Sequence, residues 1–194
     1  KLPEPRTSGD SSLESVISAR QSVRVYKNAP LSLKEVSQLL WSAQGVTHAE
    51  TLRAAPSAGA TFPLNTYVVA GNVTGLEPGL YRYECGAHDL SLVRDGDLRE
   101  ELSGLALGQS CVKDAAAILV FTAVYDRTTG TYGDRGTMYV HFDIGHAAEN
   151  VLLQSTALNL AAVPVGAFRT RSVSAALQCQ EGELALYMVP VGRP

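Results

Sequence analysis

The most regular hydrophobic pattern in the chain lies between Ser32 and Gly45. Apolar residues recur there at spacings of three and four, which predicts an amphipathic helix with one buried face: Leu33, Val36, Leu39, Leu40 and Ala43. Ser32 and Glu35 have the spacing of a capping box at the start of this helix. Gly45 is placed to end the helix in a left-handed turn.

Other helices are predicted from weaker patterns. Ser12 and Asp97 can each cap a helix, because apolar residues follow both at helical spacings: Leu13, Val16 and Ile17 after the first, Leu98, Leu102 and Leu105 after the second. Residues 139–160 are apolar on nearly all sides, which predicts a long helix buried in the protein or in a subunit interface. Residues 172–177 are predicted to form a small helix.

Alternating or continuous apolar runs predict five strands: Leu64–Ala70, Gly79–Tyr83, Asp89–Val93, Ala116–Val124 and Leu184–Val191. The first three follow one another closely enough to form a β-meander, with a turn at residues 85–88. The fourth is apolar throughout, as a central strand buried on both faces would be. Residues 161–165 are either a connection or a short strand.

The order of these elements predicts the fold class. Helices and strands do not alternate regularly, so the chain is predicted to be α+β. It has no G-x-G-x-x-G or G-x-x-x-x-G-K-[ST] motif, so neither a Rossmann fold nor a P-loop is indicated. The length of 194 residues and the 45% of hydrophobic residues fit one domain. Residues 1–11 are rich in Pro, Ser and charge, which predicts an N-terminal arm before a single domain of residues 12–194.

Charge and cysteine content limit the function classes. A net charge of −3 gives no general attraction for nucleic acid or for an anionic membrane. No apolar run approaches the ~18 residues that span a bilayer. Cys85, Cys111 and Cys179 are odd in number and widely spaced, which favours reduced thiols and a cytoplasmic location. The absence of an initial methionine leaves a removed signal peptide open.

The segment from Arg20 to Arg24 carries the most distinctive chemistry. On an extended backbone its alternate side chains, Arg20, Ser22 and Arg24, point to one side. Two guanidinium groups and a hydroxyl in that arrangement predict a phosphate site. The plainer alternative is a solvated basic turn.

Two further segments and one residue have the composition of a ligand site. Pro56–Leu64 has small residues around a hydroxyl, and Pro164–Phe168 offers backbone amides, so a flat ligand can approach both closely. The alternative for the first is a tight turn. Arg193 is a second potential phosphate ligand, or else part of a solvated terminus.

Taken in order, these segments resemble the FMN-dependent nitroreductase superfamily, most closely its SagB-type (azoline dehydrogenase-like) branch. The resemblance covers nearly the whole chain and rests on an ordered set of motifs: Arg20–Tyr26, Leu39–Gly45, Arg53 with Pro56–Ala60, Gly79–Tyr81, Tyr132–Gly136, Gly145-His146 with Asn150, and Pro164–Phe168. It implies a nitroreductase-like fold with a central, mainly antiparallel sheet flanked by helices. It also implies an intertwined homodimer with one FMN in each of two interface sites.

The resemblance implies three groups of FMN-binding residues. The group that would hold the phosphate and ribityl end is Arg20, Gln21, Ser22, Arg24 and Arg193. The group that would contact the flavin of the dimer-related site is Pro56, Ser57, Ala58 and Gly59. The group that would lie at the N5 edge of the flavin is Pro164, Val165 and Gly166. At the N5 edge, the amides of Val165 and Gly166 are expected to donate hydrogen bonds. The implied activity is ping-pong hydride transfer, in which NADH or NADPH reduces the flavin and a nitroaromatic, quinone or related small acceptor then enters the same slot.

One departure from the family pattern bears on the substrate. Azoline-oxidising members of the SagB-type branch have a Lys-Tyr pair, and the matching dipeptide here is Thr131-Tyr132. Threonine cannot act as a base with a tunable pKa, so azoline oxidation is the second hypothesis. A non-catalytic flavin-binding module is the third. Tyr132 and Arg135 are candidates for the substrate mouth, the alternatives being a core tyrosine and a surface ion pair.

A metal site was weighed on His141, Asp143, His146 and Glu149 and is not predicted. At about 100° per residue the two histidines diverge by roughly 140° around a helix, unlike the i, i+4 pair of a zinc helix. Hydrogen-bonded roles on a buried helix or at a dimer interface fit the last three residues better. No metal is therefore expected.

Overall fold

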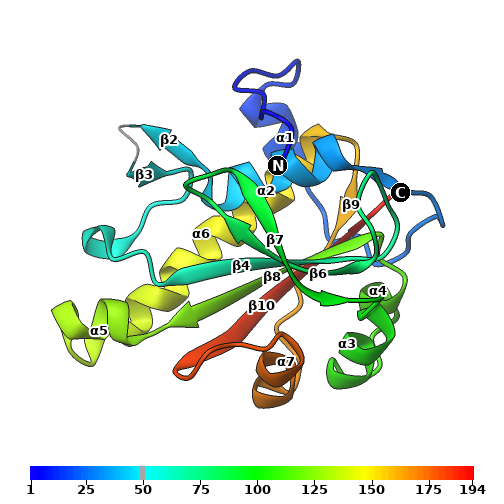
Figure 1. The fold of residues 1–194 in the computed structure, drawn as a ribbon. Coiled ribbons are helices and arrows are strands. Elements are labelled where there is room, and N and C mark those ends of the chain that lie inside the picture. Colours follow the sequence, from blue (N-terminus) through cyan, green and yellow to red (C-terminus); the bar gives the residue numbers. More distant parts are fainter. Residues whose placement is uncertain (49–50) are drawn as a thin grey trace.

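An antiparallel six-stranded sheet crosses the middle of the molecule in this computed structural model, which describes residues 1–48 and 51–194 (Figure 1). The strands lie in the order β7-β6-β4-β8-β10-β9, with these bounds: β4 Leu64–Ala70, β6 Gly79–Glu84, β7 Asp89–Asp95, β8 Ala117–Val124, β9 Ala161–Ala162 and β10 Glu183–Gly192. The predicted meander is confirmed by the neighbouring β4, β6 and β7. The predicted central strand is confirmed by β8, which lies between β4 and β10 with all but its last residue buried.

Helices cover both faces of the sheet, so the α+β prediction is confirmed. One face is packed by α2 (Leu33–Gln44) and α6 (Arg135–Ala157). The other is packed by three short helices: α3 (Arg99–Leu105), α4 (Ser110–Lys113) and α7 (Thr170–Ala176). Helix α1 (Leu13–Ala19) contacts α6, and α5 (Asp126–Tyr132) leads into α6. In this way the sheet separates two hydrophobic cores.

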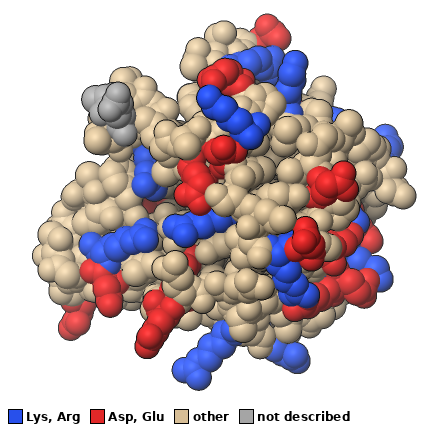
Figure 2. Space-filling view, in the orientation of Figure 1, with Lys and Arg blue, Asp and Glu red and all other residues tan. Residues whose placement is uncertain are grey.

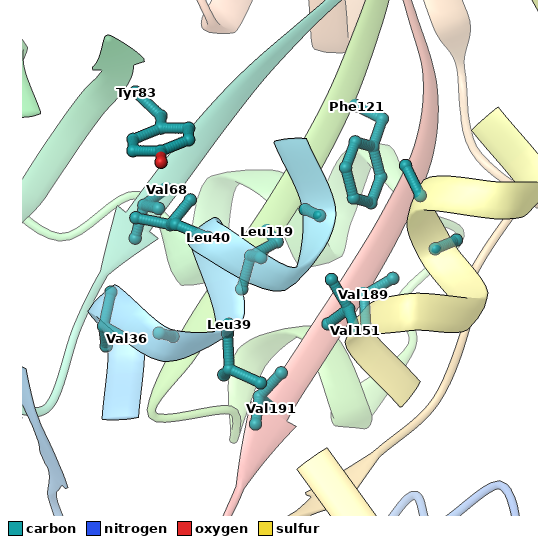
Figure 3. Close-up of a cluster of buried hydrophobic side chains, with 14 of the residues drawn as sticks. Val36, Leu39, Leu40, Val68, Tyr83, Leu119, Phe121, Val151, Val189 and Val191 are labelled. Atoms are coloured by element: carbon teal, nitrogen blue, oxygen red, sulfur yellow. The ribbon is translucent and has the colours of Figure 1, made fainter. Parts of the chain in front are cut away.

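The larger core lies under α2 and α6. Val36, Leu39 and Leu40 on α2 are fully buried. Figure 3 shows Leu40 beside Leu119 and Leu39 beside Val191 in the sheet. Fully burying a side chain of this size contributes about 1.5–3 kcal/mol. This is the buried face that the spacing of residues 33–43 predicted.

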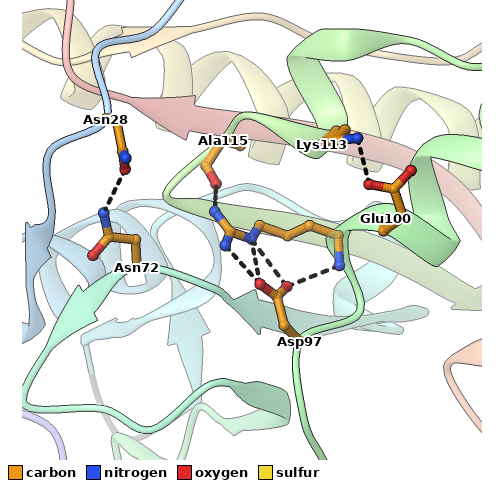
Figure 4. A network of polar contacts seen from close by, with 7 residues as sticks. Asn28, Asn72, Asp97, Glu100, Lys113 and Ala115 are labelled. Carbon is orange, nitrogen blue, oxygen red and sulfur yellow. Dashed lines mark hydrogen bonds and ion pairs between the residues drawn. The ribbon is translucent and has the colours of Figure 1, made fainter.

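A polar network fixes the start of α3 on the other side of the sheet. The Arg99 guanidinium donates to the Asp97 carboxylate and, at 2.7 Å, to the Ala115 carbonyl, while Glu100 pairs with Lys113 (Figure 4). Asp97 also accepts the Arg99 N–H at 3.0 Å, although the helix itself begins at Arg99. The N-cap residue is Leu98, which makes no side-chain cap, so Asp97 binds the first N–H of α3 from one position before the cap and is not the predicted cap itself.

The ends of α2 agree with the sequence prediction at one end only. Ser32 caps the helix and forms a complete capping box with Glu35. Gly45, predicted in a left-handed conformation, instead has φ of −62° and ψ of 148° and passes directly into β2 (Val46–His48). A Cβ at Gly45 would overlap the Trp41 ring, so the glycine is explained by close packing and not by a left-handed turn.

Three smaller features complete the fold. The long helix begins at Arg135, four residues before its predicted start. Two short pairs lie outside the main sheet: the parallel β1 (Leu31–Ser32) with β5 (Val73–Thr74), and β2 with β3 (Leu52–Arg53). Residues 1–11 form no helix or strand; Gln38 holds them by exchanging two hydrogen bonds with the Arg6 backbone, at 2.8 and 3.0 Å. Within residues 1–48 and 51–194, no helix is both long and apolar enough to cross a membrane.

Candidate functional site

The segment from Arg20 to Arg24 lies along the edge of the sheet that β9 forms. It follows the end of α1, and the Val23 N–H donates to the Ala162 carbonyl at 3.0 Å. Val23 is half-buried, whereas its neighbours Ser22 and Arg24 are exposed. Two of the three side chains predicted to bind phosphate are thus open to solvent.

The cations of this segment are free of carboxylates. None of the ion pairs within the described residues includes Arg20 or Arg24. Burial raises the pKa of the Tyr26 and Cys111 side chains, and the positive charge of Arg24 opposes that rise in both. Within the described residues, Arg24 therefore has no carboxylate at ion-pair distance.

Tyr26 anchors this segment to the last strand. A Cβ at Gly192 would lie 2.7 Å from the Tyr26 ring, so only glycine leaves room for it, and the Tyr26 hydroxyl donates to the Pro190 carbonyl at 3.3 Å. A bridge between Lys27 and Arg193 follows. The role of Gly192 is not predictable from the sequence, because a glycine at the end of a strand gives no sign of what packs against it.

Arg193 lies at this edge with its charge already paired. Its guanidinium donates to the two carboxylate oxygens of Glu35 at 2.8 and 2.9 Å and to the Pro30 carbonyl at 3.2 Å. A phosphate at Arg193 would have to share the guanidinium with Glu35.

The connection after β9 brings the Pro164–Gly166 segment to the same edge. The Val165 N–H donates to the Met188 carbonyl at 2.8 Å, and the Met188 N–H returns a bond of 3.0 Å. Gly166 is exposed, and its N–H has no backbone acceptor within the described residues. Of the two amides expected to donate to a ligand, the one at Gly166 is the one available.

The Pro56–Gly59 segment lies elsewhere, against the first half of α6. The Ala58 N–H donates to Asp143 Oδ1 at 3.4 Å, and the Ser57 hydroxyl accepts the Phe62 N–H at 3.0 Å. Three residues of this loop have left-handed backbones: Gly59 with φ of 58°, Ala60 with 53° and Phe62 with 45°. For the two that are not glycine this conformation costs about 1–3 kcal/mol each, so the surrounding contacts must hold the loop in a strained shape.

The Asp143 carboxylate connects this loop to α6. The side chain is 4% exposed, and its Oδ2 atom has no partner within the described residues. Burial raises the pKa of Asp143, while hydrogen bonds from Ser57 and Ala58 and the charge of His146 only partly oppose that rise. Asp143 is therefore a buried, hydrogen-bonded group on a helix, as predicted.

The two substrate-mouth candidates sit beside the same loop. A Cβ at Gly59 would overlap the Tyr132 hydroxyl, so Tyr132 lies directly against the loop. Tyr132 packs edge-to-face on Tyr139 with ring centroids 5.1 Å apart, and Arg135 Nε donates to the Tyr139 hydroxyl at 3.3 Å. Both side chains are exposed, and Arg135 has no ion-pair partner within the described residues.

The predicted site residues therefore contact two different parts of α6. The first group lies near β9, just beyond the end of α6 at Ala157, and the second lies over Asp143, in the first half of the helix. At 1.5 Å per residue, the helix from Asp143 to Ala157 spans about 20 Å.

The outward face of α6 is partly apolar. Phe142 is 51% exposed and Met138 is 36% exposed, with Gly145 on the same face. His146 and Glu149 are also exposed, and His141 bonds to the Tyr125 hydroxyl at 2.7 Å. Among the described residues, no group of three or more His, Cys, Asp or Glu is arranged to hold a metal.

The residues at the β9 edge fit the FMN that the sequence resemblance implies. Two guanidinium groups without carboxylate partners suit a phosphate that carries nearly two negative charges. At Gly166 the missing side chain and the free N–H leave room for a flat ring to approach the backbone. The strained loop at Pro56–Gly59 fits a contact with this ligand less directly, because it lies against a different part of α6, over Asp143.

Comparisons with known proteins agree on one family. A sequence model described as the nitroreductase family matches residues 17–193. A curated protein of Methanocaldococcus jannaschii, named a "putative nitroreductase", is 43% identical over 181 residues, which cover 93% of this chain and 90% of that protein.

Solved structures show the same likeness. A "putative nitroreductase" from Ralstonia eutropha has a TM-score of 0.85 at 33% identity. The match covers 99% of this chain and 87% of the Ralstonia chain. One from Anabaena variabilis has a TM-score of 0.83 at 31% identity and covers 94% of this chain. This chain spans 38% of that longer protein.

Further likenesses are more distant. The trifolitoxin-processing protein TfxB of Rhizobium leguminosarum is 30% identical over 115 residues, 56% of this chain and 30% of that protein. The Escherichia coli microcin synthetase McbBCD complex has a TM-score of 0.77 at 17% identity, over 97% of this chain and 75% of that chain. The NADPH:FMN oxidoreductase of Vibrio harveyi has a TM-score of 0.67 at 22% identity, over 94% of this chain and 68% of that chain. The last two show a shared fold alone.

Proposed function

We propose that this chain, which belongs to the nitroreductase family and has its fold, is an FMN-dependent NAD(P)H oxidoreductase that reduces nitroaromatics, quinones or related small acceptors by ping-pong hydride transfer. Family membership and the flavin oxidoreductase among its structural neighbours support a general oxidoreductase activity. Residues 12–194 would form the FMN-binding domain and residues 1–11 its arm. The three free cysteines favour a cytoplasmic location.

The observation that carries this proposal is the set of groups along the β9 edge. Arg20 and Arg24 have no carboxylate partner within the described residues, and they follow the same strand edge as the exposed Gly166 amide. An anion-binding end and a backbone donor on one edge suit a ligand that has a phosphate tail and a ring with hydrogen-bonding edges.

A homodimer would complete the site. The Pro56–Gly59 loop lies about 20 Å along α6 from the β9 edge, so it can meet a flavin only on another subunit. The exposed Met138 and Phe142 on α6 offer an apolar surface for that contact, and Gly145 allows a close approach of helices. Each of two sites would then combine residues of both chains.

Bound FMN would supply the hydride acceptor and donor. The chain's own residues bind and position it: Arg20 and Arg24 hold the phosphate, and Ser22 donates or accepts beside them. The Gly166 N–H donates toward the ring edge without adding an acid that titrates. Tyr132 and Arg135, beside the partner-facing loop, would border the entry for the acceptor.

Azoline oxidation by a SagB-type enzyme remains the second candidate. The similarity to TfxB and the shared fold with the microcin synthetase complex favour it. Thr131 stands against it, because the hydroxyl cannot replace the lysine of the family's Lys-Tyr pair as a base.

A visible absorption spectrum tests the proposal. The purified protein should bind FMN, and NADH or NADPH should bleach the bound flavin under anaerobic conditions. Adding a nitroaromatic or a quinone should restore the colour. Protein that binds no FMN would contradict the proposal, bleaching that is never reversed would exclude these acceptors, and binding without bleaching would favour the non-catalytic module. Aromatised product from an azoline peptide would favour the second candidate.

A further inference from the structure

Three arginine side chains from three separate elements line one cavity outside the two groups described above. Arg53 comes from β3, Arg82 from β6 and Arg127 from α5, and the cavity has a volume of about 260 Å³. In Figure 2, Lys and Arg side chains gather on this part of the surface, between β3, α5 and the nearby end of β4. Their positions in the sequence gave no reason to group them.

The cavity opens where two neighbouring strands separate. β4 and β6 pair from Tyr67 with Arg82 onward to Ala70 with Gly79. Before Tyr67, residues 64–66 of β4 pair with β8 but no longer with β6. Asn65 and Thr66 therefore line a gap at the edge of the sheet, with Arg82 on its far side.

Positive charge exceeds negative charge in this gap. The Arg127 guanidinium donates to the Phe62 carbonyl and to Asn65 Oδ1, at 3.2 and 3.3 Å, which are neutral acceptors. The Arg53 guanidinium donates to Gln44 Oε1 at 2.9 Å and lies 4.3 Å from the centre of the Phe62 ring.

One carboxylate lines the cavity. Glu84 lies 3.9 Å from Arg82, at the outer limit of an ion pair. A second, Glu183, is buried behind Asn65 and accepts its Nδ2 at 2.8 Å, outside the lining. Three arginines therefore line the cavity with one carboxylate among its lining residues, an arrangement that attracts an anion.

We propose that this cavity is a binding site for an oxyanion, either a free one or the phosphate or carboxylate end of a larger ligand. Arg82 and Arg127 bind its charge through paired N–H donors. Arg53 forms the wall toward the Pro56–Gly59 loop. Arg82 and Arg127 belong to none of the groups of FMN-binding residues that the resemblance implies.

Thermal unfolding in the presence of sodium phosphate or sodium acetate tests this proposal, with sodium chloride at equal ionic strength as the reference for screening. An anion that binds the folded protein raises the unfolding temperature beyond the chloride value. The R82Q/R127Q double variant should bind the anion about tenfold more weakly or worse, and so should lose this extra rise. The R94Q/R171Q variant removes the same charge from elsewhere on the surface and should keep it.

Arg20 and Arg24 are intact in every variant, so any anion bound at the β9 edge affects all of them equally. A larger rise with phosphate assigns a phosphate-bearing ligand, and a larger rise with acetate assigns a carboxylate. Equal rises in the wild type and R82Q/R127Q, or no rise beyond chloride in the wild type, would overturn the proposal.

A second measurement keeps the proposal testable should R82Q/R127Q fold poorly. The Nε–Hε resonances of Arg82 and Arg127 in the wild-type protein should move during a phosphate or acetate titration, while that of Arg94 stays in place. Static resonances with both anions would contradict the site.

Discussion

The Arg193 guanidinium donates two hydrogen bonds, of 2.8 and 2.9 Å, to the carboxylate of Glu35, a residue 158 positions away in the sequence. The same carboxylate accepts the Ser32 N–H at 2.7 Å, so it joins the end of β10 to the first turn of α2. Burial opposes ionisation of Glu35, but the hydrogen bonds from Ser32 and Arg193 outweigh it and lower its pKa. The residue expected to hold a phosphate is therefore also a structural clamp.

Glu35→Gln should lower the free energy of unfolding at neutral pH by about 1–2 kcal/mol, since hydrogen bonds to a partly exposed charge are lost. The folded-state pKa of Glu35 lies below its ordinary value of 4.5, so its stabilisation is complete above that value and is lost as the pH falls through the lower one. Urea unfolding at pH 7 and in acid measures the difference, which should shrink in acid. A difference that is independent of pH would contradict the clamp.

Arg20→Ala and Arg24→Ala should each weaken FMN binding by about tenfold or more, because each removes charge-assisted bonds to the phosphate. Titration of FMN fluorescence measures the dissociation constant. Arg171→Ala, an exposed arginine on α7, is the control and should leave binding unchanged. If Arg20 and Arg24 behaved like Arg171, the β9 edge would not hold the phosphate.

Gly59→Ala should destabilise the protein by about 1–3 kcal/mol, because its φ of 58° is unfavourable for alanine and the new Cβ overlaps the Tyr132 hydroxyl. Tyr132→Phe in the same chain should recover the steric part of that loss. Gly130→Ala in α5, where no atom lies within 4 Å of the new Cβ, should have no such cost. Denaturant unfolding of these variants would reject the contact if the two substitutions at Gly59 and Tyr132 proved additive.

Asp143→Asn should change how stability depends on pH. Burial raises the folded-state pKa of Asp143 above its ordinary 3.8, so the folded chain binds this proton more tightly than the unfolded chain. Wild-type stability should therefore fall, relative to the variant, as the pH rises from about 4 through the raised value. Wild type and variant would be compared by urea unfolding across this range. A stability difference that does not change with pH would show that burial does not disfavour the ionised Asp143 carboxylate.

Phe142→Asp should separate the proposed dimer, because it places a charge on the apolar face of α6 where Phe142 is 51% exposed. Sedimentation velocity should show a monomer, and bound flavin should be lost with it. Leu92→Asp on β7 changes a side chain of equal exposure, 52%, and should leave the assembly intact. A wild-type protein that sediments as a monomer would remove the basis for the shared site.

Local signals in the sequence predicted most of the elements. The spacing from Leu33 to Ala43 and the Ser32–Glu35 pair act within one helix, and both were confirmed together with the strands β4, β6, β7, β8 and β10. Helix α5 was missed, because its threonines and glycine are weak helix formers. It forms because Thr128 is buried and bonds to Thr61 at 2.8 Å, a contact between distant residues.

Relationships between distant residues account for what the sequence did not predict. Gly45 was assigned a left-handed turn from its position, whereas the Trp41 ring decides its role. The pairing of Arg193 with Glu35 and the shared cavity of Arg53, Arg82 and Arg127 join separate elements. The resemblance to a family supplied the order of the site segments, and the structure added their division along α6.

Because the predicted site residues lie at two separate parts of α6, two subunits with different defects could restore activity when they combine in one dimer. In the proposed dimer, a subunit altered at Arg20 and one altered at Gly59 would each be impaired alone, since every site in a pure population carries one of the two changes. Mixed and reassembled, they would pair at random into heterodimers that hold one site free of either lesion and one that bears both. About a quarter of all sites would then recover, a fraction that independent single-chain sites could never regain by exchange of subunits.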